Sequence, residues 1–130
     1  YSNIRKINIK NLYNNAIEAS EQCGRLDIPK IENQTNLDVL LREWPSNRKL
    51  VYCDEKISDN RSIIDTLYPL KDKNSEWAVL IGPEGGFSDS EKKLIDSNSN
   101  VISVSLGKRL LRSDTAITVS LFCIKELLSK

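Results

Sequence analysis

The chain has 130 residues, of which 39% are hydrophobic and 28% are charged, and its formal net charge is +1. This size and composition fit one globular domain with a core of its own, and the near-neutral charge does not by itself indicate nucleic-acid binding. No apolar run approaches the roughly 20 residues of a membrane-spanning helix, and no signal pattern opens the chain, so we expect a cytoplasmic protein with no membrane contact.

Histidine is absent, and the three cysteines form no CxxC pair. These two facts exclude a Ser-His-Asp triad and argue against a metal site. Cys23, Cys53 and Cys123 lie in apolar or helical patterns, so we interpret them as reduced core residues. Any chemistry must therefore use other groups.

The first half of the chain predicts two helices, an extended segment and a strand. Apolar residues at helical spacing predict a helix over 7–23 that Gly24 ends. Pro29 favours an extended segment over 25–31. A capping-box pattern at 35–38 predicts a short helix that Pro45 ends, and residues 48–53 have the composition of a strand.

The second half alternates helices and strands. Asp59 or Asn60 can cap a helix that carries Ile63 and Leu67, and the apolar run 77–81 predicts a central strand. Residues 88–91 form a second capping box, followed by a helix, a strand over 101–106 and a last helix from Ser113. This alternation predicts an α/β fold: a mostly parallel sheet with helices on both faces.

A glycine loop follows the central strand, and three of the five glycines fall within Gly82-Pro83-Glu84-Gly85-Gly86. Ligands of parallel α/β proteins often lie at the carboxyl end of a strand, although a glycine turn can also be only a tight connection. The loop matches neither the dinucleotide fingerprint nor the phosphate loop. Glu84 argues against a bound phosphate and favours a neutral or cationic ligand.

A second glycine loop, 106–112, follows the next strand. If the two preceding strands are neighbours in the sheet, both loops close on one small molecule from two sides. Glycines would then offer backbone groups to that ligand, while Leu106, Leu110 and Leu111 could form a wall against an aromatic ring.

The combination of IGPEGGFSDSE with SLGKRLLRSDTA, about twenty residues apart, resembles the ribosomal RNA small subunit methyltransferase E family of the SPOUT methyltransferases. The upstream EQCGR and the Ile28-Pro29 pair are similar to a segment of the same family, so the resemblance covers nearly the whole chain. Two departures are mild: Leu110 stands where the family often has isoleucine, and Ser113-Asp114 stands where it has threonine-glutamate.

The resemblance implies a carboxyl-terminal deep trefoil knot, a homodimer, and a site for S-adenosyl-L-methionine built from the knotted loops. It implies methylation of N3 of one uridine in small-subunit ribosomal RNA, near the decoding region. Family members carry an amino-terminal PUA-like RNA-binding domain that is absent from this chain, so we expect residues 1–130 to be the catalytic domain only.

Site residues follow from the resemblance by position. It assigns cofactor binding to Leu80, Gly82, Glu84, Gly85, Gly86, Leu106, Gly107 and Leu111. It makes Arg112 and Glu84 the catalytic candidates, and Arg25, Lys108 and Arg109 the RNA-binding candidates.

Each of these roles has an alternative. We hypothesise that Arg112, with or without Arg109, stabilises negative charge on the uracil oxygens. Lys108, Arg109 and Arg112 form a basic cluster that could contact RNA phosphates, and the alternative for this cluster is a salt bridge to Asp114 or Glu126. Glu84 either orients a ligand or braces its own loop, and Arg25 faces either RNA or a dimer partner. No general base can be named from the sequence.

Three further interpretations concern the core, the last helix and the competing functions. Tyr52 and Trp77 are expected in the core rather than as base-stacking platforms. The last helix is expected to use Ile117, Leu121, Ile124 and Leu128 on one face, and its excess of apolar residues favours a dimer contact. Alternative functions are a SPOUT transfer-RNA methyltransferase, a non-catalytic dimeric RNA-binding assembly factor, and a nucleotide-binding regulatory domain.

Overall fold

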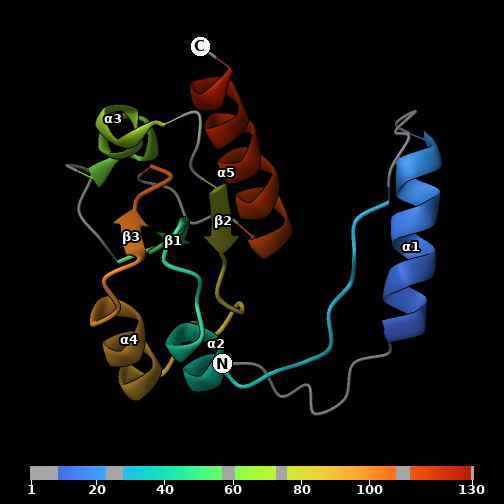
Figure 1. Ribbon diagram of the computed structural model, residues 1–130, viewed down its shortest axis with the longest axis horizontal. Coiled ribbons are helices and arrows are strands. Elements are labelled where there is room, and N and C mark those ends of the chain that lie inside the picture. The colour runs from blue at the N-terminus through green and yellow to red at the C-terminus, as the bar shows by residue number, and fades with distance from the viewer. Residues whose placement is uncertain (1–8, 23–27, 57–60, 73–75, 108–111, 130) are drawn as a thin grey trace. The chain divides into compact units, whose positions relative to one another are not determined.

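The computed structural model describes residues 9–22, 28–56, 61–72, 76–107 and 112–129. These residues fall into two units: one holds α1 (Ile9–Gln22) and the irregular segment 28–36, and the other begins at Leu37. The second unit contains, in chain order, α2 (Leu37–Arg42), β1 (Arg48–Cys53), α3 (Ile63–Leu67), the 3-10 helix η2 (Tyr68–Leu70), β2 (Glu76–Leu80), α4 (Asp89–Asp96), β3 (Val101–Val104) and α5 (Ser113–Leu128) (Figure 1). The predicted order of helices and strands is confirmed.

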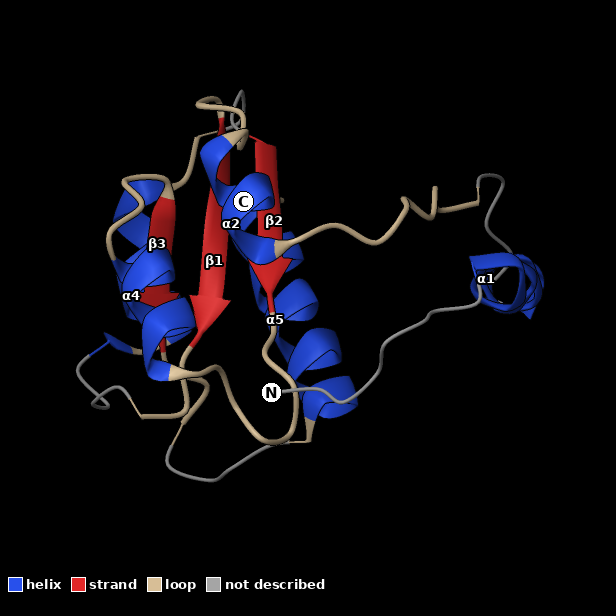
Figure 2. Cartoon of the chain, turned by 90° about the horizontal axis from the view of Figure 1, so that it is seen from below, coloured by secondary structure: helices blue, strands red, loops and turns tan. Residues whose placement is uncertain are grey.

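The three strands form a parallel sheet in the order β2-β1-β3. Tyr52 of β1 pairs with Leu80 of β2 and with Ser103 of β3. Figure 2 shows the three arrows pointing the same way. The strands before the two glycine loops are not neighbours, because β1 lies between β2 and β3, so the condition under which both loops would close on one ligand is not met by strand adjacency.

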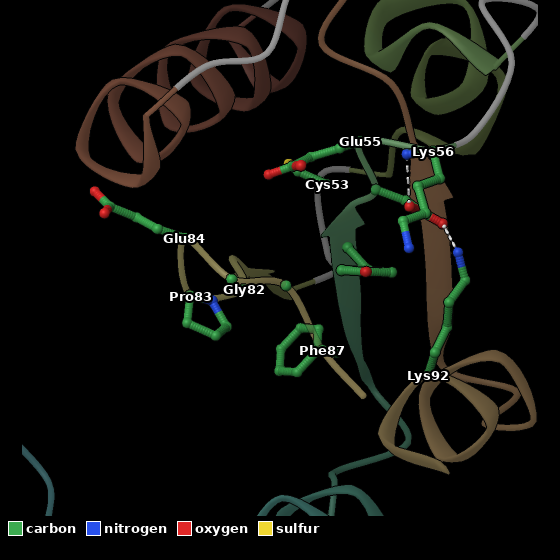
Figure 3. Close-up of a pocket in the computed structure, with 12 residues that line it drawn as sticks. Cys53, Glu55, Lys56, Gly82, Pro83, Glu84, Phe87 and Lys92 are labelled. Atoms are coloured by element: carbon green, nitrogen blue, oxygen red, sulfur yellow. Dashed lines mark hydrogen bonds and ion pairs between the residues drawn. The ribbon is translucent and has the colours of Figure 1, made fainter. Parts of the chain in front are cut away.

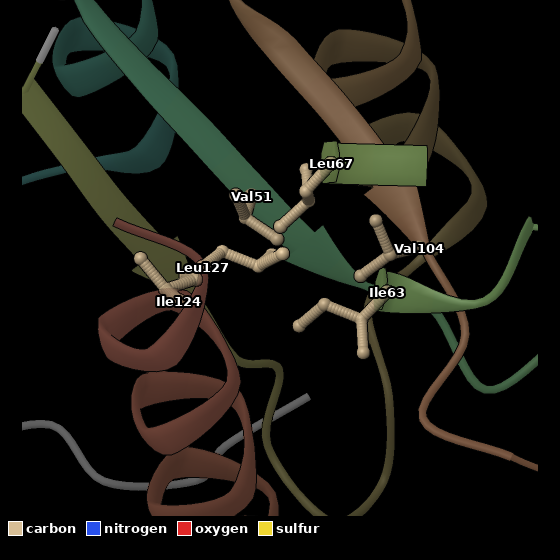
Figure 4. Packing of buried hydrophobic residues seen from close by; sticks show 6 residues of the cluster. All are labelled: Val51, Ile63, Leu67, Val104, Ile124 and Leu127. Atoms are coloured by element: carbon tan, nitrogen blue, oxygen red, sulfur yellow. The ribbon is translucent and has the colours of Figure 1, made fainter. Parts of the chain in front are cut away.

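Helices cover both faces of the sheet, as predicted, because side chains of β1 alternate between them. Val51 lies on one face in a cluster with α3 and α5 (Figure 4), formed by Val51, Ile63, Leu67, Val104, Ile124 and Leu127. The other face packs under α2 and α4 through Leu41, Leu50, Tyr52 and Ile95. Tyr52 is therefore a core residue, as expected, and Trp77 packs against the first cluster.

The N-cap of α4 is the residue predicted from the sequence, whereas the N-cap of α3 is not. Ser88 caps α4 in the predicted capping box: its hydroxyl accepts from the Glu91 N–H at 3.2 Å, and its own N–H donates to the Glu91 carboxylate at 2.8 Å. The cap of α3, however, is Ser62, whose hydroxyl accepts from the Asp65 N–H. The predicted caps Asp59 and Asn60 lie outside the described residues.

The buried face of α5 was predicted wrongly in part. Its buried stripe is Ala116, Ser120, Ile124 and Leu127, whereas Ile117, Leu121 and Phe122 are 44%, 52% and 57% exposed. Small side chains at 116 and 120 allow the helix to approach the sheet closely, so hydrophobicity alone did not identify the packed face.

Within the described residues, no helix is long and apolar enough to cross a membrane. The same part of the chain holds no group of three or more His, Cys, Asp or Glu side chains that could bind a metal ion.

Candidate functional site

The first glycine loop begins where β2 ends and returns toward α4 through a tight turn. The Gly86 N–H donates to the Pro83 carbonyl at 2.8 Å, and Gly86 has a φ of 77°, which only glycine adopts readily. Gly82 is packed tightly for another reason, since a Cβ there would lie 3.0 Å from the ring of Phe87 and the ring would have to shift. The loop conformation therefore depends on glycines at both ends.

A cavity of about 110 Å³ lies between this loop and the carboxyl end of β1 (Figure 3). Its lining comes from β1 and the turn after it, from the glycine loop and from α4: Tyr52, Cys53, Asp54, Glu55, Lys56, Gly82, Pro83, Glu84, Gly85, Gly86, Phe87 and Lys92. Because β1 is the central strand, its end contributes directly to the site.

Asp54 is the buried anion of this cavity. Its side chain is 7% exposed, and one carboxylate oxygen accepts from the Lys92 ammonium at 2.7 Å while the other accepts from the Lys56 N–H at 3.0 Å. Figure 3 shows Lys92 reaching from α4 to this position. The pair joins β1 to α4 and satisfies a charge that would otherwise be costly to bury.

Two aromatic rings lie beside the loop. Tyr52 and Phe87 meet edge to face with ring centroids 5.8 Å apart. Burial, with a further contribution from the negative charge of Asp54, raises the pKa of Tyr52 to about 12. The phenol therefore stays protonated at neutral pH and can act only as a neutral hydrogen-bonding group.

Cys53 lines the same cavity but is not activated as a nucleophile. Burial raises the pKa of the Cys53 thiol to about 11, and this outweighs the opposing hydrogen bond with Ser120. Cys53 and Cys123 are both free thiols, as expected, and Cys23 lies outside the described residues.

The second glycine motif begins at Ser105, whose buried hydroxyl contacts both the N–H and the carbonyl of Gly107. Gly107 has a φ of 117°, so it too needs glycine. The motif is joined to the first loop through Ser113, whose hydroxyl donates to the Gly82 carbonyl at 3.1 Å. This bond connects the two loops although their strands are not adjacent.

The predicted cofactor residues separate into three groups. Gly82, Glu84, Gly85 and Gly86 line the cavity. Leu80 packs on the α2 and α4 side of the sheet, Leu106 packs on the α3 and α5 side, and neither they nor Gly107 line it. Leu111 lies outside the described residues, as do Arg25, Lys108 and Arg109.

The two predicted catalytic residues are both exposed. Glu84 forms no hydrogen bond or ion pair with another described residue, and its side chain points away from Lys92 (Figure 3). Arg112 precedes α5, and its guanidinium lies 3.7 Å from the Asp114 carboxylate, with side chains 79% and 72% exposed. The alternative stated for the basic cluster, a salt bridge to Asp114, is thus present at Arg112, where it is exposed and therefore weak.

Sequence reasoning missed Asp54, Phe87 and Lys92 as residues of the site. A usable signal was available for Asp54, because it directly follows a predicted strand and all parallel strands end at the same edge of the sheet. Nothing in the sequence indicated Lys92, whose ammonium reaches Asp54 only through the packing of α4.

An open parallel α/β domain with glycine loops at the carboxyl edge of its sheet belongs to the class of proteins that bind a small ligand at that edge. A family model described as an RNA methyltransferase domain matches residues 1–125, and the chain therefore belongs to this family. The resemblance stated from the sequence is confirmed by a ribosomal RNA small subunit methyltransferase E of Rickettsia conorii, which is 34% identical over 123 residues.

Two solved structures are similar to the chain. A Legionella pneumophila protein described as a methyltransferase, in complex with the bound cofactor SAM, gives a TM-score of 0.72 at 30% identity over 93% of this chain and 50% of its own. A ribosomal RNA small subunit methyltransferase E from Neisseria gonorrhoeae, bound to S-adenosyl methionine, has a TM-score of 0.69 and 26% sequence identity. The match covers 94% of this chain and 50% of the Neisseria chain. The alignment with the Rickettsia protein covers 95% of this chain and 49% of that protein, so the chain spans about half the length of the curated relative.

Proposed function

We propose that this chain acts as the catalytic domain of an S-adenosyl-L-methionine-dependent methyltransferase that methylates N3 of a uridine in small-subunit ribosomal RNA. The observation that carries the proposal is the Ser113 bond to Gly82, which joins the two glycine motifs at one edge of the sheet. Membership of the RNA methyltransferase domain family and the names of the relatives support the reaction and the substrate.

The described residues fit such a cofactor in their chemistry. Glu84 is a carboxylate without an ion pair among the described residues, which suits a ligand that carries positive charge, and the glycines leave backbone groups accessible. A cavity of about 110 Å³ holds only part of a nucleoside-sized molecule. Residues of both motifs would therefore share the ligand: Leu80, Gly82, Glu84, Gly85, Gly86, Leu106, Gly107 and Leu111.

When bound, the cofactor supplies an electrophilic methyl group on a sulfonium. The task of the protein is to hold the uracil ring so that N3 faces that group, and alignment of this kind can lower a barrier by about 7 to 11 kcal/mol. Arg112 would stabilise negative charge on the uracil carbonyl oxygens. Its exposed contact with Asp114 is weak enough to be exchanged for a substrate oxygen.

The proton on uracil N3 must leave during the reaction, and the structure narrows the choice of base. The raised pKa values of Tyr52 and Cys53 keep both groups protonated at neutral pH, so neither can accept this proton. Glu84 or a water molecule is the better candidate, because a carboxylate at the cavity with no ion pair among the described residues can accept a proton or orient a water.

We further propose a carboxyl-terminal trefoil knot, a homodimer and a cytoplasmic location, which are the expectations of the family. The exposed apolar side chains Ile117, Leu121 and Phe122 on α5 support a contact with a second copy. A sedimentation mass equal to one chain at every concentration would refute the dimer.

Calorimetric titration of S-adenosyl-L-methionine and S-adenosylhomocysteine into the chain tests the proposed function first. Native binding that is lost in Gly86→Val, where a branched side chain would force a strained backbone, is the expected result. Binding should then be followed by methyl transfer to small ribosomal subunits and by nucleoside analysis for N3-methyluridine. A folded chain that binds neither ligand would instead favour the non-catalytic RNA-binding alternative.

A further inference from the structure

A second hollow adjoins the glycine-loop cavity, on the side of β3 and α4. This groove of about 460 Å³ is lined by Asp54, Lys56, Arg61, Lys92, Asp96, Val101 and Ser103. Three of these residues, Asp54, Lys56 and Lys92, also line the glycine-loop cavity. The groove therefore begins at the wall of the proposed methylation site and continues along β3, an outer strand of the described sheet.

Among the described residues that line the groove, positive charges outnumber negative ones, and the cations differ in whether they form ion pairs. Lys92 is paired with the buried Asp54 at 2.7 Å, so these two charges compensate each other. Lys56 and Arg61 are exposed and form no side-chain ion pair with another described residue. Of the described lining residues, Asp96 is then the one further anion, against the two cations Lys56 and Arg61.

The position of these cations suits an RNA backbone. If the target base of a single strand lies against the cofactor at the glycine-loop cavity, the phosphates on either side of that nucleotide must lie within one nucleotide of the cavity. Arg and Lys side chains are the usual partners of such phosphates, and phosphate contacts set the register of a nucleic acid without reading its sequence. A groove that shares a wall with that cavity is therefore placed to bind them.

We propose that this groove binds the phosphate backbone of single-stranded RNA next to the target nucleotide, with Lys56 and Arg61 as the phosphate ligands. That the ligand is RNA rests on the proposed function, whereas the groove and its charges are observed in the structure. Lys92 acts indirectly, because it neutralises Asp54 and removes a carboxylate charge that would repel the backbone.

The test compares Lys56→Gln/Arg61→Gln with the native chain in binding a fluorescent single-stranded oligouridylate, measured by anisotropy over a range of salt concentrations. Each lost phosphate contact reduces the magnitude of the negative slope of log affinity against log salt by about 0.7. The slope of the double variant should therefore be smaller in magnitude by about 1.4. The same relation predicts about 25-fold weaker binding at about 0.1 M salt.

Lys93→Gln/Lys125→Gln is the matched control, since it removes the same charge from exposed positions on α4 and α5 that do not line the groove. Equal losses of RNA affinity in both double variants would show only general electrostatic attraction and would overturn the proposal. Unchanged RNA affinity in Lys56→Gln/Arg61→Gln, or no RNA binding by the native chain, would also overturn it.

Calorimetry with S-adenosyl-L-methionine on the same proteins separates this proposal from the proposed function. The single variant Arg61→Gln serves here, because Arg61 lines the groove but not the glycine-loop cavity. Retained cofactor binding in Arg61→Gln, together with about five-fold weaker RNA binding at about 0.1 M salt, is the expected result and also shows that this variant is folded. If the native chain binds no cofactor but its RNA binding is still weakened by Lys56→Gln/Arg61→Gln, the methyltransferase assignment would be contradicted. The proposal that the groove binds RNA would nevertheless be supported.

Discussion

The ion pair between Asp54 and Lys92 offers the clearest test of how the site is held. In Lys92→Met, the carboxylate of Asp54 would remain buried with only the Lys56 N–H as its described partner. Lys92 belongs to α4 and Asp54 follows β1, so the change removes a direct connection between two elements that border the cavity.

The expected cost lies between two limits. Exposed ion pairs contribute about 0.2 to 1 kcal/mol, whereas breaking a buried pair costs about 3 to 5 kcal/mol. Asp54 is 7% exposed and Lys92 is 31% exposed, so one partner is buried and the other is partly solvated. We therefore expect the free energy of unfolding to fall by about 2 kcal/mol, which lowers the melting temperature by about 8 °C in a domain of this size.

Urea unfolding followed by tryptophan fluorescence measures this change, and Lys93→Met is the control on the same helix. Asp54→Asn/Lys92→Met should recover much of the loss, because no buried charge is left unpaired. If Lys92→Met costs no more than Lys93→Met, or if the double variant is less stable than Lys92→Met, the pair does not hold the site together.

Three further changes test the loops and the half-buried thiol of Cys53. Ser113→Ala should cost about 1 kcal/mol and weaken cofactor binding about five-fold in calorimetry, while Ser113→Thr should bind normally because it keeps the hydroxyl. Gly82→Ala should push the Phe87 ring away and cost about 1 to 2 kcal/mol by urea unfolding, a loss that Phe87→Leu should partly reverse; additive losses would contradict the contact. Because the pKa of the Cys53 thiol is raised to about 11 in the folded chain, the unfolded chain loses this proton first as pH rises. The free energy of unfolding should therefore fall between about pH 9 and 11. Urea unfolding measured over this pH range should show a shallower fall in Cys53→Ala.

Much of the fold could be read from local patterns. The capping box at Ser88 and Glu91 was correct to the atom, since both of its hydrogen bonds depend on residues three positions apart. The strand of β1 was predicted with its observed bounds, because it is a short apolar run between turn residues. The packed face of α5 was missed in part, because Ala116 and Ser120 are buried for their small size rather than their hydrophobicity.

In the candidate site too, some residues could be identified from the local sequence and others only from the tertiary structure. The loop from Gly82 to Gly86 was identified from its glycines and its place after a strand, and it does line the cavity. Phe87 and Lys92 were not identified, because their contacts join residues that are distant in sequence or depend on the orientation of α4.

The sequence by itself determined the order of helices and strands, the glycine positions that need unusual backbone angles, and the family, since these are carried by neighbouring residues or by motifs. Only the tertiary structure decided that β1 lies between the two glycine-loop strands, because strand order depends on how the crossover helices pack. That packing brings Asp54 to Lys92 and Ser113 to Gly82, and it places Lys56 and Arg61 along one groove.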